Sequence, residues 1–330
     1  MARKSALARV LITLLSGFCL LAMALPVQAA SEPFDLWLSK LKTDARAAGI
    51  RDTTIEAAFA EVELIEKVVS LDRKQPETVQ TFQEYMTQRL PQALVDKGKA
   101  LLNENRALLE EIGAKYGVQP RFIVALWGVE TRYGSYTGGF SVINALTTLA
   151  YDDRRADYFR GELLLALKIL DEGHIPLGEM KGSWAGAMGQ SQFMPSSFVS
   201  FAVDYDGDGK RDIWTTKADV FASAANYLAR SGWKYDETWG REVTLPAGFN
   251  PSLIDLKVAK PMAEWQALGV RKIGGGDLPG RQLVASLVQP KESRGQTFLV
   301  YDNYRTLLKW NRSTYFAMSV GFLADRIGDG

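Results

Sequence analysis

The sequence predicts a mainly α-helical protein with a small β lobe, an α+β arrangement in which helices dominate. Two stretches, residues 30–110 and 111–240, carry apolar residues at helical spacing, and the second is broken by Gly-rich turns. Only residues 241–308 have a strand-like residue pattern, because short β-type runs such as 297–301 are separated there by Pro and Gly. We expect a last helix within residues 309–330, which returns to the helical body.

Residues 1–29 have the pattern of a secretory signal peptide. Three basic residues precede an apolar stretch, residues 10–25, and small side chains stand at the −3 and −1 positions of a cleavage site after Ala29. We therefore expect a soluble periplasmic protein. The alternative is an uncleaved N-terminal anchor, although the apolar stretch is shorter than the roughly 20 residues that span a bilayer.

Composition excludes several classes of chemistry. Cleavage after Ala29 removes three Lys or Arg residues and no acidic one, which changes the formal net charge from +1 to −2. A near-neutral chain gives no reason to expect nucleic acid as a partner. Cleavage also removes Cys19, the only cysteine, so the mature chain has no thiol nucleophile and no disulfide. The single histidine, His174, makes histidine-based catalysis unfavourable.

The N-terminal stretch, residues 30–110, is expected to form a helical lobe. Leu41 and Ala45 mark one apolar stripe, and Ile55 and Phe59 mark another. Asp52 stands before the second stripe as a helix N-cap.

Glu130 is the strongest catalytic candidate in residues 111–240. Pro120 suits the first position of a helix, and Phe122, Leu126 and Glu130 then follow at a spacing of four. That face packs into the core, so burial should raise the pKa of the carboxyl towards the range of a general acid. The alternative is an ordinary glutamate at a helix end that pairs with Arg132 or a nearby lysine.

A Gly-rich segment, residues 182–197, fits no simple amphipathic element. Glycine lets the backbone approach a ligand closely, so Ser183 and Gln192 could hydrogen-bond sugar hydroxyls while Trp184 and Phe193 supply apolar walls. The alternative is a tight crossing of two helices that requires small residues.

The segment that begins at Asp204 matches the start of an EF-hand calcium loop. Its closing glutamate is missing, because Thr215 stands at position 12, but a later carboxylate could close a lengthened loop. The alternative is a solvated Asp/Gly turn. The expected ligands are Asp204, Asp206, Asp208, the backbone carbonyl of Lys210, and Asp219.

Aromatic and basic residues gather in residues 152–159, at residue 227 and in residues 309–315. Tyr and Trp rings stack on sugar faces while their polar tips stay in water. Taken alone, each of these segments is more often explained by packing.

Three of these segments occur together in one order: residues 127–134, residues 185–197 and the Asp204 loop. In that order they resemble the lytic transglycosylase B family of bacterial murein-cleaving enzymes. The resemblance implies a lysozyme-like catalytic core at residues 111–240, with the EF-hand-like loop, an added N-terminal helical lobe and a small β lobe. Many relatives carry a lipid-anchoring cysteine motif, which the bulky Phe18 before Cys19 does not supply.

The resemblance also implies roles for individual residues. Glu130 would be the sole acid and base, and the Asp204 loop would hold a structural Ca²⁺ that the chemistry does not require. Residues lining the glycan groove would be Ser183, Gln192, Tyr227, Arg155, Tyr158, Tyr85, Asn311 and Tyr315.

The implied reaction is cleavage, without water, of the β-1,4 bond between N-acetylmuramic acid and N-acetylglucosamine, which leaves 1,6-anhydro ends. Peptidoglycan glycan strands would be the partner of a monomer, with other cell-wall enzymes as further candidates. Two alternatives stay open. One is a lysozyme-type hydrolase that uses Asp152, Asp153 or Asp157 to activate water; the other is a murein-binding protein without catalysis.

Overall fold

The computed structural model describes residues 32–73 and 80–328, so the predicted signal peptide, residues 1–29, lies outside the described residues. The described residues form fourteen α-helices and seven short strands, which confirms the prediction of a mainly helical protein with a small β part. Within these ranges, no helix has both the length and the apolar character needed to cross a membrane.

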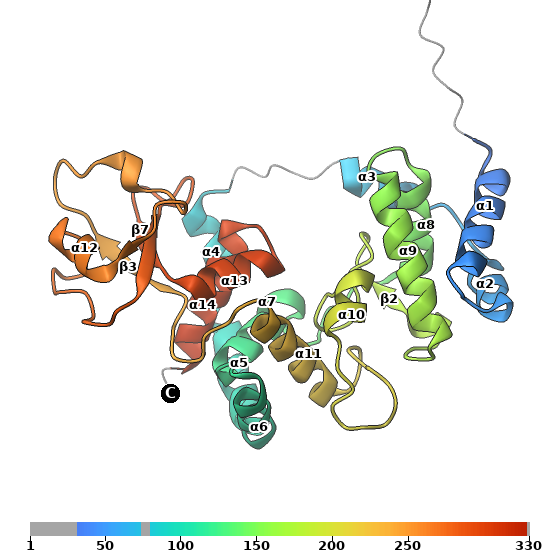
Figure 1. Cartoon of the computed structure of the whole chain (residues 1–330), viewed down its shortest axis with the longest axis horizontal. Coiled ribbons are helices and arrows are strands. Elements are labelled where there is room, and N and C mark those ends of the chain that lie inside the picture. The colour runs from blue at the N-terminus through green and yellow to red at the C-terminus, as the bar shows by residue number, and fades with distance from the viewer. Residues whose placement is uncertain (1–31, 74–79, 329–330) are drawn as a thin grey trace, which may run out of the picture.

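Two large hydrophobic cores lie side by side in an elongated molecule (Figure 1). The first, here called the α8–α9 core, includes the N-terminal helices. Its helices are α1 (Phe34–Ala47), α2 (Asp52–Phe59), α3 (Glu66–Arg73), α8 (Val142–Tyr151), α9 (Ala156–Asp171) and α10 (Pro195–Phe201). A short 3₁₀ helix (Leu177–Glu179) and the two-stranded ladder of β1 (Phe140–Ser141) with β2 (Lys181–Gly182) border it.

The second, here called the α7–α14 core, occupies the middle of the molecule. Its helices are α4 (Phe82–Arg89), α5 (Gln92–Glu104), α6 (Arg106–Tyr116), α7 (Pro120–Thr131), α11 (Lys217–Arg230), α13 (Asp302–Trp310) and α14 (Thr314–Gly328). The helices before residue 110 therefore contribute to two cores, because α1–α3 pack with α8 and α9 whereas α4–α6 pack around α7. The domain boundaries stay a prediction.

The β lobe forms the other end of the molecule (Figure 1). Its antiparallel sheet has the order β4-β6-β7-β3-β5. The strands are β3 (Gly240–Thr244), β4 (Lys260–Pro261), β5 (Arg271–Lys272), β6 (Val284–Val288) and β7 (Thr297–Val300), with α12 (Met262–Ala267) and a 3₁₀ turn (Pro251–Leu253) between them. Successive side chains of β7 point to opposite faces, so Phe298 and Val300 join the α7–α14 core while Leu299 joins the core of the lobe.

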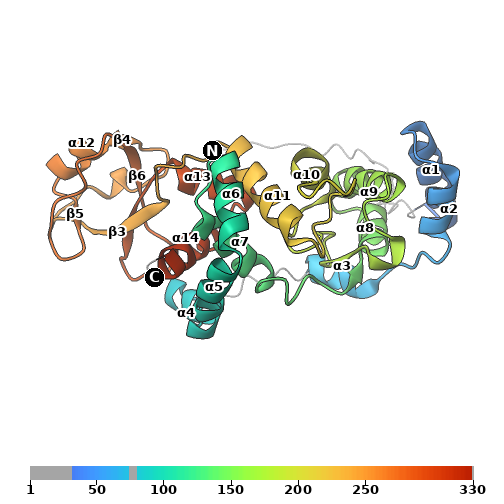
Figure 2. The ribbon, with the colours of Figure 1, turned by 90° about the horizontal axis from the view of Figure 1, so that it is seen from below.

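Helix α7 runs through the centre of its core, beside α5, α6 and α14 (Figure 2). Pro120 stands at its first position, as predicted. The helix stops because Arg132, Tyr133 and Gly134 adopt left-handed φ values of 50°, 61° and 74°. The hydroxyl of Tyr133 donates a hydrogen bond of 2.9 Å to the carbonyl of Leu94, which ties this reversal to α5. Glu130 therefore lies in the last turn of a fixed helix.

Candidate active site

Glu130 is partly buried, and its carboxylate faces an aromatic partner from a distant segment. Trp310 donates its indole N–H to Glu130 Oε1 at 2.6 Å. Burial raises the pKa of Glu130 to about 7, although the Trp310 hydrogen bond and the nearby Arg89 cation both lower it. Among the described residues no salt bridge involves Glu130, so it does not form the ion pair with Arg132 that was the alternative interpretation.

Trp310 ends α13 and stands on an aromatic cluster. Its ring centroid lies 4.7 Å from that of Tyr227 and 5.3 Å from that of Phe193. The sequence placed Trp310 in an aromatic segment but did not identify it as the partner of Glu130, because 180 residues separate the two. Tyr227, a predicted groove residue, is thus in contact with the ring that donates to the carboxylate.

Gln190 joins the Gly-rich segment to the end of α7. Its Oε1 accepts a 2.7 Å hydrogen bond from the indole of Trp127, and its Nε2 donates to the carbonyl of Trp214 at 2.7 Å. Its own carbonyl accepts from the hydroxyl of Thr131 at 3.1 Å. A Cβ on Gly134 would stand 2.3 Å from Gln190 Oε1, so only glycine permits this approach. Gln190 was not among the predicted site residues, although it lies inside the Gly-rich segment.

Ser183 and Gln192 brace the loop that contains them. Ser183 Oγ accepts hydrogen bonds from two backbone N–H groups of its own turn, at 3.0 and 3.3 Å. Gln192 has a left-handed φ of 48°, and its Nε2 donates to two carbonyls at 2.9 and 3.0 Å. Within the described residues, neither the Ser183 hydroxyl hydrogen nor Gln192 Oε1 has a hydrogen-bond partner. Both groups are therefore available to a ligand.

Tyr85 and Tyr315 form a second aromatic pair, with ring centroids 5.1 Å apart. They come from α4 and α14, which lie on the same side of the molecule as α13 (Figure 1). Asn311 is exposed, and its Oδ1 accepts from the backbone N–H of Ser313 at 3.0 Å, where the chain turns into α14.

Arg155 and Tyr158 lie on the opposite side of the molecule, at the start of α9. Arg155 and its neighbour Arg154 pair with Asp72 of α3, a carboxylate that is fully buried. Tyr158 is 49% exposed and therefore leaves ring surface open to solvent. These two predicted groove residues have no contact with Glu130 among the described interactions.

The three carboxylates considered for a hydrolase also lie in this turn, around the start of α9. Asp152 is paired with Arg73 of α3 at 2.6 Å, while Asp153 and Asp157 are exposed. None of the three interacts with Glu130 within the part of the chain that the structure describes.

Two carboxylates of the EF-hand-like loop converge with one from the first turn of α11. One oxygen each from Asp204, Asp206 and Asp219 lie within 4.8 Å of one another. Asp219 is fully buried, and burial together with the two neighbouring carboxylates raises its pKa to about 6, against hydrogen bonds from the N–H groups of Tyr205 and Asp212 that lower it. Clustered oxygen ligands with a buried carboxylate fit a Ca²⁺ ion, which prefers such donors.

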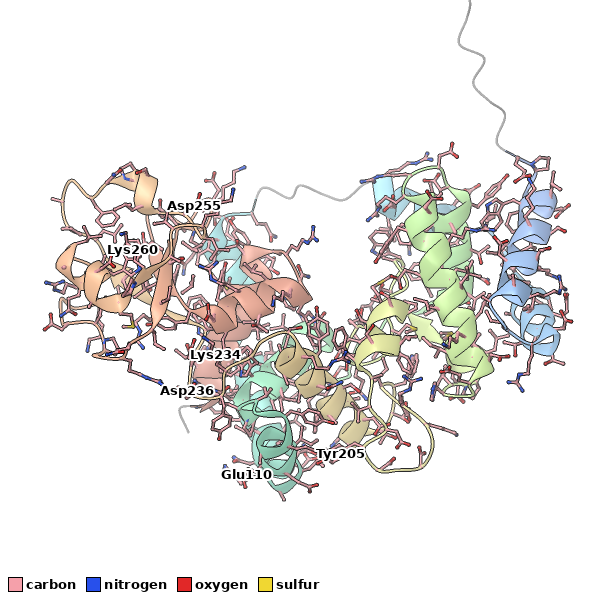
Figure 3. All side chains as sticks on the ribbon, in the orientation of Figure 1. Glu110, Tyr205, Lys234, Asp236, Asp255 and Lys260 are labelled. Carbon is pink, nitrogen blue, oxygen red and sulfur yellow. The ribbon has the colours of Figure 1, made fainter. Side chains whose placement is uncertain are left out.

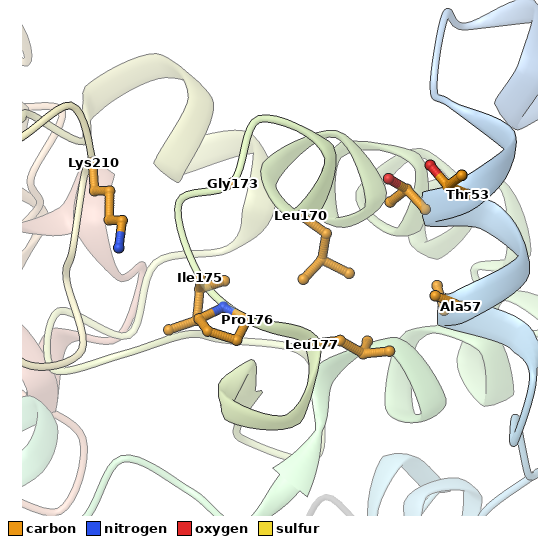
Figure 4. Close-up of a pocket in the computed structure, with 10 residues that line it drawn as sticks. Thr53, Ala57, Leu170, Gly173, Ile175, Pro176, Leu177 and Lys210 are labelled. Atoms are coloured by element: carbon orange, nitrogen blue, oxygen red, sulfur yellow. The ribbon is translucent and has the colours of Figure 1, made fainter.

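Asp208 and Lys210 are not among the three clustered residues. Asp208 is exposed and accepts a 2.8 Å hydrogen bond from the N–H of Lys210. The Lys210 side chain lines a pocket of about 370 Å³ against α2 and the end of α9 (Figure 4). Tyr205 lies beside α6 and donates to Glu111 at 2.8 Å, which anchors the loop to that helix (Figure 3).

The fold and these motifs define a class of protein. Residues 33–325 match the model of the transglycosylase SLT domain, and the chain belongs to this family. Its architecture is the lysozyme-like fold of lytic transglycosylases, which confirms the predicted fold class.

Individual relatives agree with this assignment. The chain is 36% identical over 242 residues to the membrane-bound lytic murein transglycosylase B of Escherichia coli (strain K12), an alignment that covers 71% of this chain. That alignment spans only 63% of the relative, less than two thirds of its length.

Solved structures are similar over more of the chain. SltB3 from Pseudomonas aeruginosa, in complex with NAG-anhNAM-pentapeptide, is 45% identical with a TM-score of 0.88 over 90% of this chain and 80% of that one. The Escherichia coli lytic transglycosylase SLT35 in complex with calcium is 29% identical with a TM-score of 0.76, over 91% of this chain and 94% of that one.

Proposed function

We propose that this protein is a murein lytic transglycosylase with Glu130 as its single acid and base. It would cleave the β-1,4 bond between N-acetylmuramic acid and N-acetylglucosamine and form a 1,6-anhydromuramoyl end. The observation that carries the proposal is the partly buried Glu130 with a pKa of about 7, because such a carboxyl is substantially protonated at neutral pH. SltB3, a relative at 45% identity, was solved with NAG-anhNAM-pentapeptide, which has the expected type of end.

In the first step, protonated Glu130 donates its proton to the glycosidic oxygen, and the bond between that oxygen and muramyl C1 breaks. The positive charge that develops at C1 needs a stabilising partner, which ordinary glycosidases supply with a second carboxylate. None of the described carboxylates interacts with Glu130, and Asp152 is already paired with Arg73. The muramyl acetamido group would therefore stabilise C1 from within the substrate.

In the second step, Glu130 is ionised and takes the proton of the muramyl C6 hydroxyl. The C6 oxygen attacks C1 and closes the 1,6-anhydro ring, so Glu130 returns to its protonated form and no water is consumed. The other predicted groove residues would bind the glycan. Ser183 and Gln192 fit this role because each keeps one polar atom without a partner in the described structure.

We also propose a calcium site, a cellular compartment and an oligomeric state for this enzyme. Asp204, Asp206 and Asp219 would hold a structural Ca²⁺, with Asp208 and the Lys210 carbonyl as further ligands, and the reaction itself requires no cofactor. The predicted leader supports export to the periplasm, where glycan strands are the substrate. We propose a soluble monomer there, with other cell-wall enzymes as candidate partners.

Mass spectrometry of the products tests the proposal. The mature protein, incubated with purified peptidoglycan, should release anhydromuropeptides, which are one water lighter than reducing muropeptides. Reducing ends would instead assign a hydrolase, and the absence of any soluble product would favour a binding protein.

Glu130→Gln tests the assignment of the acid. The amide cannot donate or accept the proton, so turnover should fall by about a thousandfold while glycan binding is retained. Wild-type turnover should decline on the alkaline side as pH rises through about 7, since the protonated form acts first. Near-normal turnover by the variant would refute the role of Glu130.

A further inference from the structure

Trp310 connects the two halves of the helical body at the carboxylate. Its side chain packs against both the α7–α14 core and the α8–α9 core. We propose that Trp310 is a positioning residue that selects which oxygen of Glu130 carries the catalytic proton. This inference rests on the proposed function for its kinetic consequence, but the hydrogen bond can be tested without turnover.

Trp310 is held on its ring and on its backbone. The Tyr227 ring meets it edge-on at 4.7 Å and an interplanar angle of 63°, and Phe193 packs at 5.3 Å. The Tyr227 hydroxyl donates to the carbonyl of Lys309 at 2.8 Å, one residue before the indole. Lys309 Nζ in turn donates to the carbonyl of Ser231 at 2.6 Å. The indole N–H is therefore presented to Glu130 in one orientation.

The chemistry of this donor distinguishes the two carboxyl oxygens. An indole N–H can donate a hydrogen bond but can neither accept one nor take up a proton at ordinary pH. In a protonated carboxyl group the carbonyl oxygen is the better acceptor, so the bond to Trp310 makes Oε1 the carbonyl oxygen. The proton is then on Oε2, for which no hydrogen-bond partner exists among the described residues. Oε2 would donate to the glycosidic oxygen.

The same bond favours the second step. After Oε2 has donated its proton, the N–H of Trp310 bonds to a carboxylate, and a hydrogen bond to a charged acceptor is stronger than one to a neutral acceptor. The ionised form that must accept the C6 proton is thereby stabilised in the same orientation. The proton moves from Oε2 to the substrate and returns to Oε2, and tryptophan takes no part in the transfer.

Among the described residues, Arg89 is the one charged group that shifts the pKa of Glu130. Arg89 belongs to α4 and donates to the carbonyl of Val129 at 2.7 Å. Burial raises the pKa of Tyr227 in α11, so its hydroxyl stays protonated and neutral around pH 7. A change of the Trp310 N–H resonance with pH near 7 would therefore report the titration of Glu130.

Nuclear magnetic resonance of the indole N–H tests the bond directly. In the ¹⁵N-labelled mature protein, the Trp310 resonance is assigned by its loss in Trp310→Phe. We expect its chemical shift to titrate with a midpoint near pH 7 in the wild type and to lose that midpoint in Glu130→Gln. A wild-type resonance that stays flat through this range would overturn the proposal, whatever reaction the protein catalyses.

Steady-state kinetics of Trp310→Phe test the effect of this hydrogen bond on turnover. The phenyl ring keeps most of the packing but has no N–H, so kcat should fall about tenfold or more while KM changes by less than about threefold. The alkaline decline of kcat/KM should move up by about one pH unit, because a hydrogen bond that favoured the ionised form is lost.

A matched control separates this effect from loss of packing. Trp239 also donates its indole N–H to a carboxylate, Asp325 Oδ2 at 2.8 Å, but in the α7–α14 core on the side of the β lobe. Trp239→Phe should leave the pH profile unchanged below its unfolding temperature. An alkaline limb in Trp310→Phe that coincides with the wild type and with Trp239→Phe would overturn the kinetic part. Absence of turnover in the wild type would instead contradict the proposed function.

Discussion

Replacement of Asp219 by asparagine is expected to abolish the stabilisation of this protein by calcium. The Asp219 pKa is raised from 3.8 to about 6, a shift that corresponds to roughly 3 kcal/mol of unfavourable free energy in the ionised, metal-free form. Because the folded pKa is raised, this cost is absent below about pH 4. It develops as pH rises to about 6, so the metal-free protein loses stability across that window.

The Asp219→Asn substitution has two opposing effects in the absence of metal. It removes the buried charge, which relieves most of that cost. It also leaves one of the two N–H donors, from Tyr205 or Asp212, facing an amide NH₂ group, at a cost of about 1–3 kcal/mol. The metal-free variant and wild type should therefore have similar stability at neutral pH, and their difference should appear on addition of calcium.

Thermal unfolding followed by circular dichroism measures that difference. At calcium near 100 times Kd the wild type should gain about 2.7 kcal/mol, which raises Tm by roughly 5 °C over the protein in chelator. Asp219→Asn should shift by about 1 °C or less, and Asp153→Asn, an exposed acid outside the loop, should keep the full shift. A wild type with no shift up to ~10 mM calcium, or an Asp219→Asn variant with the same shift as the wild type, would refute a calcium site at Asp219.

Two further substitutions test how the site is supported. Gly134→Ala should lower the free energy of unfolding by about 2 kcal/mol in urea, since its Cβ meets Gln190 at 2.3 Å and its φ is +74°. Gly139→Ala, where nothing lies within 4 Å, is the control, and equal losses would contradict the steric argument. Asp72→Asn should cost about 2 kcal/mol in the same assay, because two arginines lose a buried partner. The exposed pair of Asp44 with Arg160 gives the comparison, and Asp44→Asn should cost no more than about 0.5 kcal/mol.

Several features could be predicted because they depend on neighbours in the sequence. Apolar spacing and Pro120 at a first helical position predicted the helix that ends near Glu130, and the structure has it as α7. The change from a helical to a strand-like residue pattern after residue 240 likewise predicted the small sheet. Spacing alone also made Asp219 a candidate to close the Asp204 loop, since both lie within sixteen residues of one another.

Other features had no local signal. The helices before residue 110 divide between two cores, and helical periodicity does not show which core an apolar stripe will face. Arg155 was expected in a groove, but the structure also pairs it with Asp72, which lies 83 residues earlier. Gln190 was passed over because nothing in its own segment indicates that Trp127 and Trp214 will meet it.

The sequence by itself determined that the body is helical with a small sheet after residue 240, which carboxylate stands at the end of a buried helix, and which acidic residues share one loop. These properties follow from local stereochemistry and from the periodicity of apolar side chains. Only the tertiary structure decided that Trp310 donates to Glu130 and that the carboxylates of Asp204, Asp206 and Asp219 converge. The physical reason is that pKa values and hydrogen-bond partners depend on desolvation and on groups brought together by packing, and packing joins residues that are remote in the chain.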